Sequence, residues 1–425
     1  MKVVHISAFD ELGGAARAAY RLHAGLRRIG VQSRMFVGDK SSNDDTVTNY
    51  VPPNDPWSRL RREMRRRALA RSLNGYRIAG PVGLRNFSDD RSIHESDVWR
   101  QIPEHDLVHL HWVAGFLDYT AFFAGLSART PVVWTLHDMN PFTGGCHYDE
   151  DCGKFAAACG ACPQLGSKDA NDLSHQVWQR KRKAFETVSR GRMHVAADSS
   201  WLASEARRSS AFAGLPVTAI HYGLDIETFA PRDRLAARSV LGIPADARVV
   251  LFGADHIEIQ RKGLSFLIEG LAGLPEDSRA FLVSMGRGVP RLPERLPHLH
   301  LGYVSGDRFL SIVYSAADVF AIPSLQEAFG QTALESMACG TPVVGFNVGG
   351  IREVVTDGVT GLLVPVRDSG ALRDAIGKLL SNAALREELA SNCRKTAVGE
   401  YTLEIQAKRY VELYQRLLSK QEHPA

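Results

Sequence analysis

The sequence of 425 residues has no long apolar run, and none approaches the roughly 18 consecutive apolar residues of a membrane-spanning helix. Cysteine is scarce at six residues, and 37 glycines are far fewer than a collagen-like chain of this length contains. A chain this long buries a large core without disulfide bonds, which excludes small disulfide-stapled scaffolds. Polar residues follow residues 1–6 too early for a secretory signal peptide, so we expect a cytoplasmic protein.

Charge is nearly balanced, and the small excess of positive charge lies in one segment. The chain has 51 Lys and Arg against 47 Asp and Glu, while residues 59–73 alone hold seven arginines and one glutamate. Trp57, Leu60, Met64 and Ala68 fall on one face of a helix through this segment. Such a basic amphipathic helix suits anionic lipid headgroups, so we expect residues 57–73 to meet a membrane surface, with a solvated or ion-paired face as the alternative. No nucleic-acid recognition motif accompanies the run, and we expect no nucleic-acid partner.

Strand and helix patterns alternate along the chain in two successive series. The first series has apolar strands near residues 3–7, 32–37, 106–111, 131–136, 194–199 and 217–221. The second has strands near residues 248–253, 280–284, 299–304, 319–322 and 342–346. Short apolar strands separated by helices are typical of buried parallel sheets. The sequence therefore predicts an α/β protein with two Rossmann-like, doubly wound domains.

The predicted domains divide the chain into three parts. We expect an N-terminal domain over residues 1–235, with an insertion at 41–105 and a cysteine-rich loop at 144–165. A C-terminal domain follows over residues 236–402. Residues 403–425 are expected to form a helix that crosses back to the N-terminal domain, because their apolar residues recur at helical spacing.

The most informative segment, residues 323–345, carries two glutamates eight residues apart. A loop with Glu327 and Gly330 leads from a strand into a helix that starts near Gln331 and contains Glu335. A helix N-terminus presents unpaired N–H groups, so Gly330, Gln331 and Thr332 are candidates to bind a phosphate. Glu327 would accept hydrogen bonds from sugar hydroxyls, and Glu335 from a vicinal diol such as a ribose. From the two glutamates alone, a surface helix with solvated carboxylates is an equally good interpretation.

The run from residue 327 to residue 365 contains EAFGQTALE, ACGTPVV, GGIREVV and DGVTGLLV. It resembles the donor half of retaining glycosyltransferases of family 4, the glycosyl transferases group 1 of polysaccharide biosynthesis. The resemblance implies the GT-B fold, in which two Rossmann-like domains face each other across a cleft. It also implies a hexosyltransferase that moves a sugar, with retention, from a nucleotide-diphosphate sugar to a glycan or lipid-linked glycan. Cell-envelope, lipopolysaccharide or exopolysaccharide biosynthesis would be the setting, with peripheral attachment at the inner face of the plasma membrane.

Two alternatives to this function stay open. One is a synthase that glycosylates a small soluble sugar. The other, of a different class, is a non-catalytic sugar-nucleotide-binding or membrane-adaptor protein. Glu327, Glu335, Lys262 and His137 are all present, which argues against a decayed enzyme.

The resemblance also assigns residues of the donor site. It assigns Glu327 to the transferred sugar and Glu335 to the nucleotide ribose. Phe329, Gly330 and Gln331 would offer backbone N–H groups to the sugar and diphosphate. Tyr303 and Val304 stand where the family holds the base.

Cations are expected near the leaving group, because glycosyl transfer leaves negative charge on the phosphate. Lys262, followed by Gly263, matches the family's Lys-Gly pair. Where the family has an arginine about five residues earlier, Ile257 stands in this chain, and Arg261 is the nearest substitute. We expect no catalytic metal or other catalytic cofactor, and the acidic residues 149–151 are interpreted as a solvated loop.

Glycines and histidines of the first domain complete the predicted site. Gly13 and Gly14 either permit a tight turn or, as in the family, approach the donor diphosphate. His137 ends a predicted strand and matches the family's strand-end histidine, which contacts the donor sugar or the reacting centre. His111 and Asp138 are expected on the acceptor side, and Asp138 could instead orient His137.

Four of the six cysteines lie within 17 residues, at Cys146, Cys152, Cys159 and Cys162. Four thiolates can form a closed tetrahedral zinc site, and Cys-x2-Cys is a frequent half-site. The spacing between the first two is wider than usual, so a structural zinc and free thiols both remain interpretations. A zinc here would shape a loop on the acceptor side.

Overall fold

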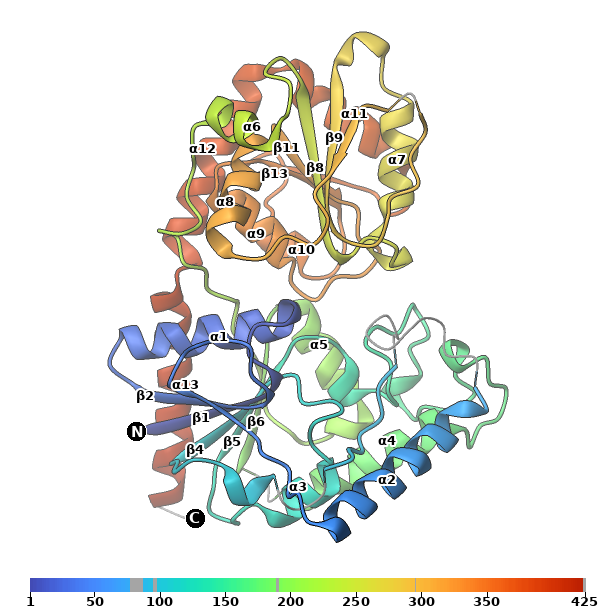
Figure 1. Ribbon diagram of the computed structural model, residues 1–425, viewed down its shortest axis with the longest axis vertical. Helices are drawn as coiled ribbons and strands as arrows, with labels where there is room; N and C mark the ends of the chain where they lie inside the picture. Colours follow the sequence, from blue (N-terminus) through green and yellow to red (C-terminus); the bar gives the residue numbers. More distant parts are fainter. Residues whose placement is uncertain (77–86, 95–97, 189–190, 295, 423–425) are drawn as a thin grey trace. The chain divides into compact units, whose positions relative to one another are not determined.

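The computed structural model describes residues 1–76, 87–94, 98–188, 191–294 and 296–422 (Figure 1). The chain divides into two compact units: Met1–His221 with Gln406–Ala425, and Tyr222–Ile405. The first unit ends at His221, earlier than the domain boundary predicted after residue 235. Each unit contains one parallel sheet with helices packed on it, which is the two-domain, Rossmann-like α/β fold predicted from the alternating pattern.

The N-terminal sheet has the strand order β3-β2-β1-β4-β5-β6-β7 among the described residues, and every pairing in it is parallel. Its strands are β1 (Lys2–Phe9), β2 (Gln32–Asp39), β3 (Val47–Asn49), β4 (Leu107–Leu110), β5 (Val132–Leu136), β6 (Met193–Ala197) and β7 (Val217–Ala219). Its helices are α1 (Gly13–Arg28), α2 (Pro56–Asn74), α3 (Tyr119–Gly125), α4 (Leu173–Glu186) and α5 (Ser200–Arg208).

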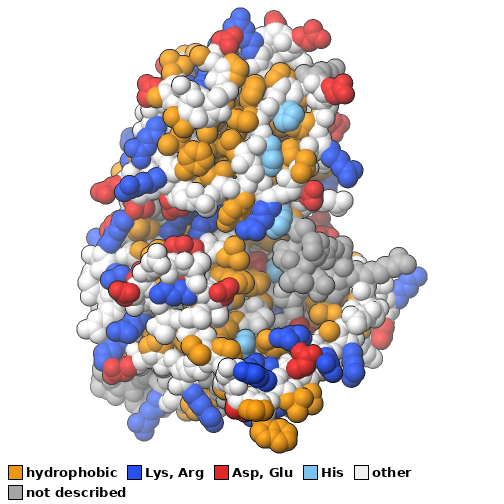
Figure 2. Space-filling model, viewed as in Figure 1, with side chains coloured by type: hydrophobic (Ala, Val, Ile, Leu, Met, Phe, Trp, Pro, Cys, Tyr) orange, Lys and Arg blue, Asp and Glu red, His pale blue; other side chains and the backbone are white. Residues whose placement is uncertain are grey.

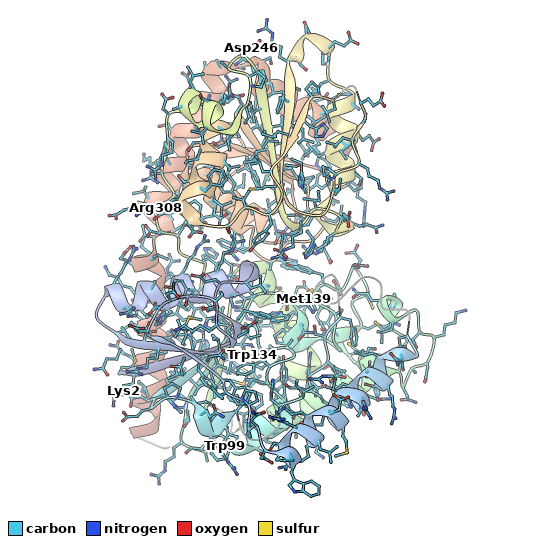
Figure 3. The ribbon with its side chains drawn as sticks, viewed as in Figure 1. Lys2, Trp99, Trp134, Met139, Asp246 and Arg308 are labelled. Atoms are coloured by element: carbon cyan, nitrogen blue, oxygen red, sulfur yellow. The ribbon has the colours of Figure 1, made fainter. Side chains whose placement is uncertain are left out.

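Burial explains the continuous apolar strands of this unit. Trp134 of β5, labelled in Figure 3, is fully buried. Its ring packs against those of Tyr119, Phe123 and Phe185. The final helix, α13 (Leu403–Glu422), covers the same domain from Gln406 onward. Its apolar face joins a core cluster with Val3 of β1 and Leu22 of α1; the helix residues of that cluster are Ala407, Tyr410, Leu413, Tyr414 and Leu417.

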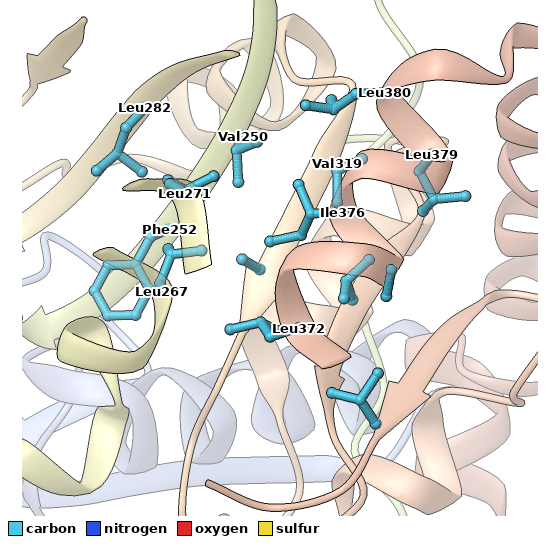
Figure 4. Packing of buried hydrophobic residues seen from close by; sticks show 14 of the residues in the cluster. Val250, Phe252, Leu267, Leu271, Leu282, Val319, Leu372, Ile376, Leu379 and Leu380 are labelled. Atoms are coloured by element: carbon cyan, nitrogen blue, oxygen red, sulfur yellow. The ribbon is translucent and has the colours of Figure 1, made fainter. Parts of the chain in front are cut away.

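The C-terminal sheet has the order β10-β9-β8-β11-β12-β13 among the described residues. Its strands are β8 (Arg248–His256), β9 (Ala280–Arg287), β10 (His298–His300), β11 (Val319–Ile322), β12 (Val343–Phe346) and β13 (Gly361–Val364). Its helices are α6 (Arg234–Leu241), α7 (Leu264–Ala272), α8 (Asp307–Ala316), α9 (Gln331–Ala338), α10 (Ile351–Val354), α11 (Ser369–Ser381) and α12 (Ala383–Glu400). Leucine and isoleucine side chains of α7 and α11 pack on β8, β9 and β11 (Figure 4).

The two sheets share one topology, and this places the predicted site residues. In each, the chain starts in the middle, winds outward and then reverses, so the order changes direction between β1 and β4 and between β8 and β11. Ligands of open α/β sheets bind at the carboxyl ends of the strands at such a point. Gly13 and His111 follow β1 and β4, whereas Lys262 and Glu327 follow β8 and β11. Both groups of predicted residues therefore lie at a ligand-binding edge of their own sheet.

Local structure differs from the prediction in two places. Residues 41–105 were expected to stay outside the strand series, yet β3 extends the sheet by pairing with β2. The sequence did not predict this strand because β3 has three residues, too few to show an alternating apolar pattern. The predicted strand at 299–304 was also too long: β10 ends at His300, and Gly302 has a left-handed φ of 67° that a strand does not adopt. Residues 77–86 and 95–97 of the predicted insertion lie outside the described residues.

Candidate functional site

Lys262 and Glu327 form the centre of the candidate site in the C-terminal domain. Lys262 Nζ donates a hydrogen bond to Glu327 Oε2 over 2.6 Å, and Arg261 approaches the same oxygen at 3.7 Å. Ser324 also donates its hydroxyl proton to this carboxylate, at 3.3 Å. The prediction that a cation of the loop after β8 and a glutamate of the loop after β11 share one site is consistent with this geometry.

Burial and charge act together on these groups. Burial lowers the pKa of Lys262, and the negative charge of Glu327 opposes this shift. The carboxylate of Glu327 therefore stabilises the charged ammonium form of Lys262. Burial raises the pKa of Glu327, but the charges of Lys262 and Arg261 and the hydrogen bonds outweigh it, and the net shift is downward. The carboxylate is therefore ionised at neutral pH with two cations beside it. An anionic ligand can compete with Glu327 for those cations.

Backbone contacts hold the two loops together. Leu325 N–H donates to the carbonyl oxygen of Arg261 at 2.8 Å, and the Arg261 guanidinium donates to the Gln326 carbonyl. Gly263 has a φ of 74°, and a Cβ atom built there would overlap the carbonyl oxygen of Pro323. The glycine after Lys262 is therefore required twice, by its backbone angle and by the close approach of the second loop.

Ile257 does not take the place of the family's upstream arginine as a ligand-facing group. It is 1% exposed and belongs to the hydrophobic core of the C-terminal sheet. Arg261, 3.7 Å from Glu327, is the cation that stands beside Lys262.

Glu335 lies in the first turns of α9, which begins directly after Gly330 in a left-handed conformation with a φ of 100°. Its side chain is only 3% exposed and accepts a hydrogen bond of 2.8 Å from the hydroxyl of Tyr314 on α8. The solvated-helix interpretation is therefore wrong for Glu335. Tyr314 was not singled out in the sequence, because its contact with Glu335 depends on how α8 and α9 pack.

The other predicted donor residues surround this centre in different ways. Phe329 is 1% exposed and its ring packs edge-on against Tyr222, so its side chain belongs to the core. Gln331 and Thr332 are half-buried at the start of α9. Val304 is buried in the loop after β10. Beside it, the exposed ring of Tyr303, also expected at the base, stacks under the guanidinium of Arg287 at 4.2 Å. The sequence had not indicated this contact with Arg287.

Histidines occupy the edge of the N-terminal sheet. His111 is 1% exposed and lies between two other histidines: its Nε2 is 2.8 Å from His5 Nδ1, and its Nδ1 is 3.1 Å from His137 Nε2. His137 follows β5 and is half-buried. Burial lowers its pKa to about 3, so the ring is neutral at physiological pH. His5 was missed in the sequence because it sits inside a strand rather than at a strand end.

Asp138 and Gly13 serve local structure as well. Asp138 accepts a hydrogen bond from Asn140 N–H at 2.9 Å, and its other oxygen is 3.4 Å from His147. Gly13 starts α1 with a φ of 85°, and a Cβ atom at this position would meet no atom within 4 Å. The turn interpretation of Gly13 thus has a backbone reason, and the space beside it leaves room for a ligand.

The four clustered cysteines line one pocket together with Phe87 and Phe155. All are free thiols, and burial raises the pKa of Cys159 to about 11. Among the described residues, His5, His109 and His111 have ligand atoms that all lie within 4.8 Å of one another. No three of the clustered cysteines meet this distance. The loop as it stands does not present a closed tetrahedral set of thiolates.

The basic segment forms α2, which begins at Pro56 with Asp55 as its cap. Trp57, Leu60 and Met64 are 73%, 48% and 54% exposed, so the apolar face points to solvent beside the arginines (Figure 2). Arg65 pairs with Asp118 at 2.7 Å and anchors the helix. No helix in the described ranges is long and apolar enough to cross a membrane.

Comparison with known proteins supplies the class. Residues 247–382 match the family model described as Glycosyl transferases group 1. The D-inositol 3-phosphate glycosyltransferase of Xylanimonas cellulosilytica is 29% identical over 93% of this chain and 91% of its own length. The sucrose-phosphate synthase of Thermosynechococcus elongatus has a similar structure, with a TM-score of 0.67, 21% identity and coverage of 99% of this chain and 100% of that one.

A second solved structure is similar over the whole chain. It is Anabaena HepE in complex with UDP and glucose, with a TM-score of 0.67, 18% identity and coverage of 98% of this chain and 100% of that one. The two Rossmann-like domains thus have the GT-B architecture, and the protein is a glycosyltransferase. Its C-terminal domain carries the group 1 glycosyltransferase match at residues 247–382.

Proposed function

We propose that the enzyme transfers a hexosyl group from a nucleotide-diphosphate sugar to a small soluble acceptor, with retention of anomeric configuration. The observation that carries the proposal is the convergence of Lys262 and Arg261 on Glu327 at the carboxyl edge of the C-terminal sheet. Two cations beside a carboxylate suit a sugar diphosphate, since the phosphate meets the cations and the hydroxyls meet the carboxylate.

Each residue has a proposed part in the transfer. Lys262 and Arg261 stabilise the negative charge that grows on the leaving diphosphate, and Glu327 orients the sugar through its hydroxyls. Glu335, held by Tyr314, accepts hydrogen bonds from the ribose. The backbone N–H groups of Gly330 and its neighbours meet the phosphate at the start of α9.

Retention in this proposal needs no protein nucleophile. The acceptor attacks from the face that the diphosphate leaves, and the departing phosphate oxygen takes the proton of the acceptor hydroxyl. His137 contacts the donor sugar or the reacting centre, while His111 and Asp138 belong to the acceptor side of the N-terminal domain.

The small acceptor is proposed on the relatives' names. D-inositol 3-phosphate glycosyltransferase and sucrose-phosphate synthase are named for small soluble, phosphorylated molecules. This favours the synthase alternative over transfer to a glycan or lipid-linked glycan. HepE in complex with UDP-glucose makes UDP-glucose the first donor to test.

A panel of nucleotide sugars tests the donor. We expect one of them, at about 100 times its dissociation constant, to stabilise the protein by about 2.7 kcal/mol, seen as a raised midpoint of thermal unfolding. The Glu335→Ala variant should lose most of this shift, whereas Glu388→Ala on α12 should keep it. With that donor, incubation with phosphorylated polyols and hexoses should yield a glycosylated product by mass spectrometry. If the protein binds a donor but transfers its sugar only to components of a lipid extract, the acceptor is a glycolipid and the small-acceptor proposal is wrong.

The exposed face of α2 supports a second proposal, peripheral contact with an anionic membrane. The helix carries seven arginines, and its apolar residues Trp57, Leu60 and Met64 face solvent. We expect co-sedimentation with vesicles containing anionic lipid, lost when Trp57 and Leu60 are replaced by serine. The same helix with Arg66 and Arg67 replaced by glutamine should bind more weakly and with less dependence on salt. Equal sedimentation of all three proteins would contradict this contact.

A structural zinc at the four clustered cysteines remains a proposal as well. The thiols surround one pocket, and the N–H of Gly144 donates to Cys159 Sγ at 3.1 Å, as zinc-bound thiolates often accept. Because three thiols do not lie within 4.8 Å of one another, binding would draw the loop inward. Protein purified under reductant should contain about one zinc per chain by elemental analysis, and the Cys159→Ser, Cys162→Ser double variant should contain none. Wild-type protein without zinc would leave four free thiols.

A further inference from the structure

Buried histidines run across three neighbouring strands of the N-terminal sheet. His5 lies inside β1 and is 0% exposed, His111 follows β4 and is 1% exposed, and His137 follows β5 and is half-buried. The row therefore leads from the core of the domain to the ligand-binding edge of its sheet. A histidine buried inside a strand cannot contact a substrate directly. It can act on the reaction only through the residues that it contacts.

The rings of His5, His111 and His137 form a hydrogen-bonded chain. His5 Nδ1 is 2.8 Å from His111 Nε2, and His111 Nδ1 is 3.1 Å from His137 Nε2. Burial lowers the pKa of each ring, so each is neutral and carries one proton at physiological pH. A neutral imidazole donates from one nitrogen and accepts at the other. The tautomer of one ring therefore determines the tautomer of the next.

Only two proton arrangements satisfy both hydrogen bonds. In the first, all three protons are on Nδ1, so His137 accepts at Nε2 and keeps its own proton on Nδ1. In the second, all three are on Nε2, which leaves His5 with a buried N–H at Nε2. That atom has no hydrogen-bond partner among the described residues. An unpartnered buried N–H is rarer in proteins than an unpartnered acceptor, so the first arrangement is favoured.

A metal ion would be the competing explanation, because His5, His109 and His111 have ligand atoms within 4.8 Å of one another. Both nitrogens of His109 are already hydrogen-bonded at 2.6 Å, Nδ1 to the hydroxyl of Tyr414 and Nε2 to that of Thr135. The rings of His109 and His111 also stack, with centroids 4.3 Å apart and planes inclined by 28°. Stacked rings with occupied nitrogens fit a hydrogen-bonded chain better than a coordination sphere.

We propose that His5 and His111 are positioning residues that hold His137 in its Nδ1–H tautomer, so that His137 donates a hydrogen bond at the active edge and does not act as a base. That the hydrogen bond goes to an oxygen of the donor sugar or its phosphate rests on the proposed function. The tautomer itself does not. In the transfer, the acceptor's proton then leaves with the departing phosphate oxygen rather than on His137.

Histidine-selective ¹⁵N labelling of the full chain tests the tautomer directly. We expect His137, identified by the signals missing from His137→Gln, to show a protonated Nδ1 and an unprotonated Nε2 at neutral pH. A protonated Nε2, or averaged shifts at both nitrogens, would overturn the proposal. Elemental analysis of the same sample should find no metal that disappears in His109→Ala, since a metal lost with His109 would favour the coordination site instead.

Two variants of nearly equal size separate tautomer control from packing. In His111→Asn the amide N–H can still donate to His137 Nε2, whereas in His111→Asp a carboxylate accepts there and draws a proton onto Nε2. We expect His111→Asn to keep the Nδ1–H signal and most of kcat, and His111→Asp to move the proton and lower kcat by about 100-fold with KM less changed. Equal losses of kcat without a change of tautomer would show a packing role only and overturn the proposal. If no nucleotide sugar supports turnover of the wild type, the proposed function fails while the ¹⁵N spectrum still decides the tautomer.

Discussion

Replacing Lys262 by methionine is expected to lower kcat for sugar transfer by about 10²- to 10³-fold, the loss found when one fixed group that stabilises transition-state charge is removed. Lys262 Nζ is 2.6 Å from Glu327 Oε2, and the lysine side chain is half-buried. Methionine has a side chain of similar length but carries no charge, so it cannot stabilise the negative charge that develops on the leaving phosphate. The measurement is steady-state transfer with the donor found by thermal shift, at saturating acceptor.

The control for this variant is Lys378→Met, which removes an exposed lysine from α11 in the same domain. It should keep kcat within about twofold, since surface substitutions change stability by only about 0.5 kcal/mol. Lys262→Met should also fold, because Arg261 at 3.7 Å still faces the Glu327 carboxylate. Wild-type turnover in Lys262→Met would remove Lys262 from the proposed catalytic group and leave Arg261 as the working cation.

Replacing Gly263 by alanine is expected to destabilise the C-terminal domain by about 3 kcal/mol or more, through the two effects of left-handed strain and backbone overlap. The backbone at Gly263 has a φ of 74°, and the new Cβ atom would overlap the carbonyl oxygen of Pro323. Relief requires the loops after β8 and β11 to separate, which moves Lys262 away from Glu327. We expect a lower midpoint in denaturant and loss of transfer.

Gly242→Ala separates the two effects. Gly242 caps α6 with a φ of 69°, but a Cβ atom there meets nothing within 4 Å, so only the backbone strain of about 1–2 kcal/mol applies. It should lower the midpoint less than Gly263→Ala and leave kcat unchanged. If the two variants lose equal stability and both keep activity, the close contact between the loops has no role in placing Lys262.

The alternation of strands and helices, and the grouping of the residues proposed to bind the donor, could be predicted from local pattern. Apolar strands between amphipathic helices need only a few consecutive residues to be recognised, and they led to two parallel sheets. Glu327 and Glu335 lie in one continuous segment at the end of a strand, so their neighbourhood follows from their spacing. The family resemblance assigned Lys262 to the same site as Glu327; the two side chains are hydrogen-bonded, and the role of Lys262 in donor binding stays a prediction.

Other features could not be predicted, because they depend on residues far apart in the chain. Tyr314 meets Glu335 only when α8 packs beside α9. The edge strand β3 has three residues, too few for a periodic signal, and its pairing with β2 gives it its conformation. The four cysteines are close in sequence, yet the folded loop keeps their thiols from gathering within 4.8 Å in threes.

The absence of long apolar runs and of disulfide-type cysteine content, together with two α/β series, was enough to determine the class: a large protein built from two parallel-sheet domains. Composition is a sum over residues, and periodicity depends only on neighbours in the chain. Both can therefore be determined from the sequence without knowing the fold. The tertiary structure decided which side chains act together. His5 and His111 are 106 positions apart and become neighbours at 2.8 Å only because β1 pairs with β4, and the same pairing ties the proton of His137 to a residue in the core.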